Sequence, residues 1–249
     1  YAIIPCPCPL SSHYLGRVYG WSSRVEGGLI GIHGLTPTYG SWLNVNAHWR
    51  VLTLSVAMPT VIVATGNPGK LKELQVYLTP LGWELQLKPT DIDVDETGTT
   101  FMENARLKAS EVASATQQWA IADDSGLQID ALNGAPGLYS ARYGTDAQDR
   151  INRVLRELSG TQDRSAQFGC ALALARPDGT IALETEGICA GEILTAPKGT
   201  NGFGYDPIFY VPSQRKTFAE MSDQQKETHS HRGIAFAQIM AELRQLTLS

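Results

Sequence analysis

Two short stretches of the chain combine residue types that suit phosphate and metal chemistry. The first, TGNPGKLKEL (65–74), places two glycines, an asparagine and a lysine ahead of a helix-forming segment. Exposed backbone N–H groups in such a loop, together with the lysine charge, suit a bound phosphate. It is not a Walker A loop, because Gly66 and Gly69 are only three apart and Leu71 stands where the Mg²⁺-binding hydroxyl belongs. A plain strand-to-helix turn is the alternative interpretation.

The second stretch, ADDSG (122–126), begins at the last residue of the apolar run WAIA (119–122). We expect that run to be a short buried strand, which places Asp123 and Asp124 at its end. Two buried carboxylates are costly unless they meet a cation or water. Mg²⁺ typically binds one or two carboxylates together with substrate phosphates. A helix cap or a turn is the alternative, since Asp, Ser and Gly favour both.

Three further groups of polar residues are candidates for the same site. Glu96 has no evident structural task and is a candidate metal ligand or base, whereas Glu103 fits a capping box with Thr100. The loop GFGYDP (202–207) carries aromatic rings that can stack on a base. The segment KETHSHRG (226–233) concentrates cationic and hydrogen-bonding side chains in an acidic protein. A packed turn and a solvated helix start are the alternatives for these last two.

Strands and helices alternate around the candidate residues. The apolar pattern predicts strands at 60–65, 83–89 and 119–122, helices at 69–78, 100–118 and 146–160, and a long hairpin at 165–193 that turns at Pro177-Asp178-Gly179. A last helix has Phe236, Ile239, Met240 and Leu243 as its core face. These elements predict an α/β fold with a mixed sheet.

Composition limits the class of protein. With 249 residues, 43% of them hydrophobic and 18% charged, the chain is globular and long enough for one large or two small domains. The net charge of −5 gives no sign of broad binding to nucleic acid, and no run reaches the roughly 18 apolar residues of a membrane span. Cys170 and Cys189 lie in apolar runs, so we expect buried thiols and a cytoplasmic location. Cys6 and Cys8 form only a weak metal motif.

The composition changes near Met58. Residues 1–57 hold three of the five Trp, three of the five His and only four charged residues, so they carry a charge of +2 and the remainder carries −7. No helical or alternating period persists there. We therefore expect residues 1–57 to be an N-terminal extension of unknown role, outside the functional domain, and residues 58–249 to form that domain. A small accessory domain is the alternative for the first segment.

Six motifs occur in one order along the chain: TGNPGK, ETGTTFMENARLKA, ADDSGL, GAPGLYSARY, FGYDP and SHRG. Together they closely resemble the inosine triphosphate pyrophosphatase family, over about residues 60–246. The resemblance implies Mg²⁺-dependent hydrolysis of the non-canonical purine nucleotides ITP, dITP and XTP to the monophosphate and pyrophosphate. It also implies a homodimer, and an elongated, twisted mixed sheet flanked by helices with a nucleotide cleft between two lobes.

The resemblance also implies a role for each matching residue. Asp124 is the expected catalytic proton acceptor, supported by Asp123, and Glu96 and Asp124 are the expected metal ligands. The residues expected to contact the nucleotide are Thr65, Gly66, Asn67, Pro68, Gly69, Lys70, Ser125, Phe203, Gly204, Tyr205, Asp206, Lys226, His231 and Arg232.

Three other functions compete with this interpretation. The nearest is a Maf-type nucleotide pyrophosphatase acting on pyrimidine or modified nucleotides, and the SHRG and FGYDP motifs argue against it. A catalytically silent nucleotide-binding module is disfavoured because Lys70, Glu96 and Asp124 are all in place. A P-loop kinase is disfavoured because the Walker Ser/Thr is missing.

Removal of residues 1–57 is expected to leave hydrolysis and dimerisation intact, because that segment differs in composition and carries none of the six motifs. ITP hydrolysis and size-exclusion chromatography of the full chain and of a chain beginning at Met58 test this. An insoluble or inactive shortened chain would show that the extension is part of the working structure.

Overall fold

Seven strands form one mixed sheet in the computed structural model, which describes residues 59–246. Their order across the sheet is β2-β1-β3-β4-β5-β6-β7. The strands are β1 (Thr60–Val63), β2 (Glu84–Leu87), β3 (Trp119–Ile129), β4 (Ser165–Ala175), β5 (Ile181–Ile193), β6 (Phe209–Val211) and β7 (Lys216–Thr217). This confirms the predicted α/β fold with a mixed sheet.

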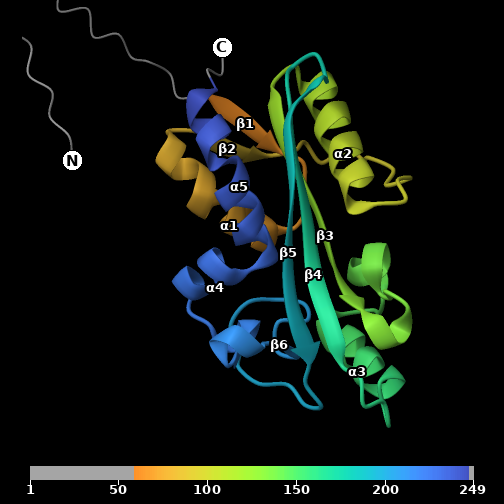
Figure 1. The fold of residues 1–249 in the computed structure, drawn as a ribbon. Helices are drawn as coiled ribbons and strands as arrows, with labels where there is room; N and C mark the ends of the chain where they lie inside the picture. Colours follow the sequence, from red (N-terminus) through yellow and green to blue (C-terminus); the bar gives the residue numbers. More distant parts are fainter. Residues whose placement is uncertain (1–58, 247–249) are drawn as a thin grey trace, which may run out of the picture. The chain divides into compact units, whose positions relative to one another are not determined.

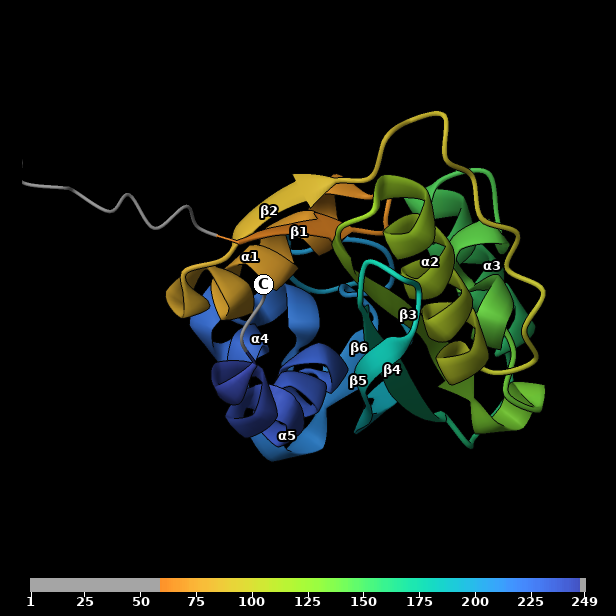
Figure 2. The same cartoon turned by 90° about the horizontal axis from the view of Figure 1, so that it is seen from above.

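Helices cover both faces of the sheet. They are α1 (Pro68–Leu78), α2 (Phe101–Thr116), α3 (Ala147–Glu157), α4 (Asp223–His229) and α5 (His231–Gln245). Helices α2 and α3 lie on one side of the long strands, and α1, α4 and α5 lie on the other (Figures 1 and 2). Between residues 59 and 246, no helix is both long and apolar enough to cross a membrane.

The sheet is parallel at one side and antiparallel at the other. Strand β1 pairs in parallel with both β2 and β3, and its sequence TVIV is the continuous apolar run expected of a parallel strand buried on both faces. Strands β4 and β5 form the predicted long hairpin, whose turn contains Gly179 at φ 84. Strand β4 is buried along nearly its whole length, because α2 covers one of its faces and α5 the other.

The prediction of a short strand ending at Ala122 is wrong. Strand β3 continues through both aspartates to Ile129, because β4 pairs with it from Ala120 to Ile129. What ends near the aspartates is the pairing with β1, whose last partner on β3 is Ile121. The two carboxylates therefore lie in the middle of β3, at the point where β1 turns away toward α1.

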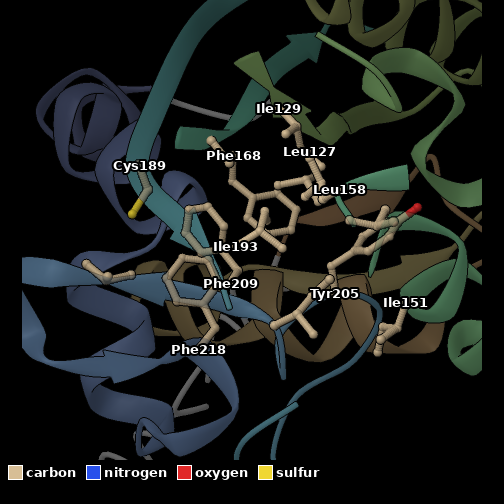
Figure 3. Packing of buried hydrophobic residues seen from close by; sticks show 14 of the residues in the cluster. Leu127, Ile129, Ile151, Leu158, Phe168, Cys189, Ile193, Tyr205, Phe209 and Phe218 are labelled. Carbon is tan, nitrogen blue, oxygen red and sulfur yellow. The ribbon is translucent and has the colours of Figure 1, made fainter. Parts of the chain in front are cut away.

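Three apolar clusters hold these elements together. One packs α1 and α5 on β1, and a second packs the alanine face of α2 on β1, β3 and β4. The third surrounds Phe168 of β4, which meets Phe209 edge-on at 4.8 Å between ring centroids and stacks near Phe218 (Figure 3). The end of the β4–β5 hairpin that lies next to β6 thus has a core of its own, distinct from the core around β1.

A glycine permits the close approach of α5 to the hairpin. A Cβ atom on Gly187 of β5 would collide with the carbonyl oxygen of His231 and lie 2.5 Å from the backbone nitrogen of Ala235. Both obstacles are main-chain atoms of α5, so the whole helix would have to move.

Gly187→Ala is therefore expected to destabilise the protein by about 1–3 kcal/mol or more, the usual cost of forcing extra volume into a packed interior. Urea denaturation of the variant and the wild type measures the loss. Gly66→Ala is the matched control, because a Cβ there meets nothing within 4 Å. Equal midpoints for all three proteins would contradict the proposed role of this contact.

Candidate active site

One cleft gathers most of the predicted site residues. It opens beside the middle of β3, and the space between its walls, including the open mouth, is about 860 Å³. The predicted residues that line it are Asn67, Lys70, Glu96, Asp124, Ser125, Phe203, Gly204, Tyr205, Asp206, Lys226, His231 and Arg232.

The rest of the predicted phosphate loop does not line this cleft: Thr65, Gly66, Pro68 and Gly69. Asn67 caps α1 by accepting a hydrogen bond from the Gly69 N–H at 2.9 Å, and its own N–H donates to Thr65 Oγ1 at 3.1 Å. Two backbone donors that were expected to face a phosphate are thus used within the loop. The charged group that the loop presents to the cleft is the Lys70 ammonium.

Asp123 is a fully buried anion between two cations. Its carboxylate lies 2.8 Å from Lys70 Nζ and 2.6 Å from Arg232 Nη2, and its side chain has no exposed surface. Burial disfavours the charged form, but the charges of Arg232, Lys70 and Lys108 outweigh it and hold the pKa of Asp123 well below its usual value. Asp123 thus stays ionised, and its carboxylate holds the side chains of Lys70 and Arg232 in place.

Asp124 lies on the opposite face of β3, in the wall of the cleft. Lys108 Nζ from α2 is 2.7 Å from Asp124 Oδ1 and 3.0 Å from Glu96 Oε1, so one ammonium joins the two carboxylates. Burial raises the pKa of Asp124, and the charge of Lys108 offsets this only in part. A carboxylate with a raised pKa beside a cleft is suited to accept a proton.

The Glu96–Asp124 pair has the geometry of a cation site. Oxygens of both carboxylates converge on one position, which the Lys108 ammonium holds. Within residues 59–246, no group of three or more His, Cys, Asp or Glu side chains is placed to hold a metal ion. Two protein carboxylates fit Mg²⁺, which commonly fills its remaining positions with water and substrate phosphates.

Arg232 lies in the wall of the cleft and links α1 to β3. It is 1% exposed, its Nη1 pairs with Glu73 of α1, and its Nη2 contacts Asp123 and, at 3.2 Å, Ser125 Oγ. Its Nε has no hydrogen-bond partner among the described residues. The guanidinium is therefore held rigidly and still has unused N–H groups.

His231 is held as a neutral ring next to Arg232. It stacks on Phe168 with 4.8 Å between centroids and is 5% exposed. Burial, with the charges of Arg232 and Lys226, holds the pKa of His231 well below its usual value. Its Nδ1 faces no partner in the part of the chain that is described. This nitrogen is the second unsatisfied polar atom in this part of the cleft.

The two aromatic residues of the FGYDP motif differ in their surroundings. Tyr205 is 4% exposed and its hydroxyl donates to the Ser140 carbonyl at 2.9 Å, so it packs and ties the loop to the opposite wall. Phe203 is 38% exposed, with the Lys226 ammonium 4.8 Å from its ring centroid. Asp206 fixes the loop by accepting from the Phe203 N–H at 2.8 Å and from Lys226 at 2.6 Å. Phe203 is thus the aromatic face of this motif that is open to a ligand.

Sequence reasoning missed four contributors to the site: Glu73, Asn104, Lys108 and Arg142. Lys108 had a readable signal, because it falls on the face of α2 that is otherwise formed by Ala105, Ala109 and Val112. A lysine on an apolar helix face needs a buried anion. Glu73 and Arg142 had no such signal, since their partners Arg232 and Glu96 are 159 and 46 residues away.

Comparison with known proteins gives concordant matches. The sequence profile of the Ham1 family matches residues 61–242. A dITP/XTP pyrophosphatase of Synechocystis sp. is 62% identical over 183 residues, which cover 74% of this chain and 94% of the relative. One of Nostoc sp. is also 62% identical over 183 residues, covering 74% and 93%.

Solved structures agree with the sequence matches. A HAM1 protein from Coxiella burnetii is 42% identical with a TM-score of 0.69, covering 76% of this chain and 100% of that protein. The Staphylococcus aureus Ham1 protein is 41% identical with a TM-score of 0.67, covering 75% and 98%. These matches confirm the resemblance that the six motifs predicted. Because the profile spans most of the chain and the relatives are matched over nearly their whole length, this chain belongs to the Ham1 family.

Proposed function

We propose that this chain hydrolyses the non-canonical purine nucleoside triphosphates dITP, XTP and ITP to the monophosphate and pyrophosphate. The observation that carries the proposal is the position of Asp124 and Glu96 around one cation position in a cleft that also presents Lys70. The dITP/XTP pyrophosphatases that share 62% of their residues with this chain support the same reaction and substrate class.

The proposal includes Mg²⁺ as the cofactor. Glu96 and Asp124 would hold it, with the remaining positions taken by water and phosphate oxygens. When bound, it would neutralise charge on the phosphates. Lys108, which holds both carboxylates in the structure, would then be free to face the phosphates from α2.

The chain's own residues account for the proton and for the charge of the leaving group. Asp124 orients a water molecule and takes its proton as the oxygen attacks phosphorus. Lys70 and Lys108 offset the negative charge that develops on the departing pyrophosphate. No covalent enzyme intermediate is needed, and the buried Cys170 and Cys189 are unsuited to form one.

Base choice follows from Phe203, His231 and Arg232, which line the same cleft. Phe203 offers a ring on which a purine can stack. Hypoxanthine and xanthine carry a keto oxygen at C6, and the unused N–H groups of Arg232 and a ring nitrogen of His231 suit that acceptor. Adenine carries an amino group there and would leave the donors unsatisfied, which can give about 10⁴-fold discrimination.

The proposal also covers the oligomeric state, the location in the cell and the extent of the catalytic domain. We propose a homodimer, on the resemblance to the inosine triphosphate pyrophosphatase family, and a cytoplasmic location, to which the two free buried thiols are suited. We propose residues 58–249 as the catalytic domain. Residues 1–57, including Cys6 and Cys8, lie outside the described residues.

Asp124→Asn is expected to lower ITP turnover by about 10²-fold or more while the fold is retained, since the amide cannot act as the base. Lys108 keeps Glu96 as a partner in this variant, so the structural cost is limited. Pyrophosphate release with Mg²⁺, together with circular dichroism, tests both statements. Near wild-type hydrolysis by the folded variant would remove Asp124 from the mechanism.

Arg232→Lys is expected to lower kcat/KM for ITP far more than for ATP, because lysine keeps a charge for Asp123 but loses the fixed donors. Alanine is less informative here, because it would leave Asp123 and Glu73 without their shared cation. Lys70→Ala is the control: it should lower ITP and ATP alike, since contacts to phosphate do not sense the base. An equal loss for both nucleotides in Arg232→Lys would show that Arg232 does not read the base.

A further inference from the structure

Asn104 of α2 is buried between the two halves of the cation site. It is 3% exposed. Its Oδ1 accepts a hydrogen bond from the Gly98 N–H at 2.8 Å, and its Nδ2 donates to Asp124 Oδ2 at 3.3 Å. Gly98 is two residues beyond Glu96, so one amide links the segment that carries Glu96 to the carboxylate of Asp124.

The orientation of this amide follows from its partners. A backbone N–H only donates, so the oxygen of Asn104 must face Gly98, and the NH₂ group must then face Asp124. An ionised carboxylate only accepts, which suits the NH₂ group. Both ends of the side chain are therefore satisfied in this orientation, and the opposite one would place donor against donor and acceptor against acceptor.

The segment that carries Glu96 is irregular, and its main-chain ties to α2 include the Gly98 N–H bonded to Asn104 and the Thr99 N–H, which donates to the Glu103 carboxylate at 2.6 Å. Residues 88–100, between β2 and α2, contain no helix or strand. Gly98 packs so closely on the start of α2 that a Cβ atom would lie 2.6 Å from Asn104 Oδ1 and 2.7 Å from Glu103 Cβ. The contact with Asn104 thus needs both the amide and a glycine opposite it.

Lys108 cannot by itself keep the two carboxylates together once another cation takes its place. It is the ammonium of Lys108 that bridges Glu96 and Asp124 in the structure. Two anions without that bridge repel each other. The neutral amide of Asn104 does not occupy the cation position. Its hydrogen bonds therefore persist when a divalent cation replaces the Lys108 ammonium between the two carboxylates.

We propose that Asn104 is a positioning residue that holds Glu96 and Asp124 at the separation required to share one divalent cation. This inference rests on the proposed function. Residues that hydrogen-bond metal-binding carboxylates commonly change metal affinity by about 10–100-fold when they are removed. Asn104 itself touches neither the cation nor the reacting atoms.

The test is direct cation binding by the full chain, with Mn²⁺ as the probe. Electron paramagnetic resonance measures bound Mn²⁺ in the presence of the α,β-methylene analogue of ITP, which cannot be cleaved, with analogue alone as the blank. Asn104→Leu, of similar size but unable to hydrogen-bond, is expected to weaken Mn²⁺ binding by about tenfold or more. Thr100→Ala is the matched control: it removes the N-cap of the same helix, which accepts from the Glu103 N–H, and it is expected to leave Mn²⁺ affinity unchanged.

Two further variants separate positioning from general stability. Asn104→Ala serves if the leucine variant does not fold, since water can enter the vacated space. Gly98→Ala pushes the same segment away from an intact Asn104 and should weaken Mn²⁺ binding similarly. Because both act on one contact, the double variant should lose less than the sum of the two single losses.

Each outcome is decisive. Unchanged Mn²⁺ affinity in a folded Asn104 variant, or additive losses in the double variant, would overturn the inference while leaving the proposed function in place. A wild-type chain that binds Mn²⁺ but does not hydrolyse ITP, dITP or XTP would overturn the proposed function alone. A wild-type chain that binds no Mn²⁺ beyond the blank would overturn the cation site and this inference with it.

Discussion

Two adjacent carboxylates in the middle of a buried strand are the constraint on which the site depends. Successive side chains of a strand point to opposite faces of the sheet, so Asp123 and Asp124 must find their cations on different sides. Asp123 meets Lys70 of α1 and Arg232 of α5, and Asp124 meets Lys108 of α2. Helices α1 and α5 lie on one side of β3 and α2 lies on the other (Figure 2), and each of the three contributes one positive charge to this strand.

This arrangement couples the site to the fold, but unequally for the two aspartates. Breaking a fully buried ion pair by removing one partner costs about 3–5 kcal/mol, because a bare charge is left behind. Asp123 has no exposed side-chain surface and holds two cations from separate helices. Asp124 borders the cleft, where water reaches it, and its partner Lys108 has a second anion in Glu96. Removal of Asp123 is therefore expected to destabilise the fold far more than removal of Asp124, which can take part in chemistry.

Local patterns in the sequence predicted the hairpin and every described α-helix except α4, because capping residues, turn glycines and apolar periods act within a few residues. The extent of β3 was not predictable in this way. Asp-Asp-Ser-Gly reads as the end of a strand, and only pairing with β4, about 40 residues later, extends it. The motifs identified most of the cleft, but the partners of Arg232 did not follow from them. Its pairing with Glu73 joins residues 159 apart, and a single sequence contains no signal for such a contact.

The cleft also explains how an acidic chain with a net charge of −5 can suit a polyanionic substrate. The lysines in its wall and the neighbouring Lys108 are already paired: Lys70 with Asp123, Lys226 with Asp206 and Glu73, and Lys108 with Glu96 and Asp124. A triphosphate that draws Lys108 away would leave Asp124 without its ammonium partner. Release of Lys108 requires another cation for Glu96 and Asp124, whereas Asp123 keeps Arg232 if Lys70 turns to a phosphate. In the proposed function, cation and nucleotide would therefore favour each other's binding, because each would supply the charge that the other displaces.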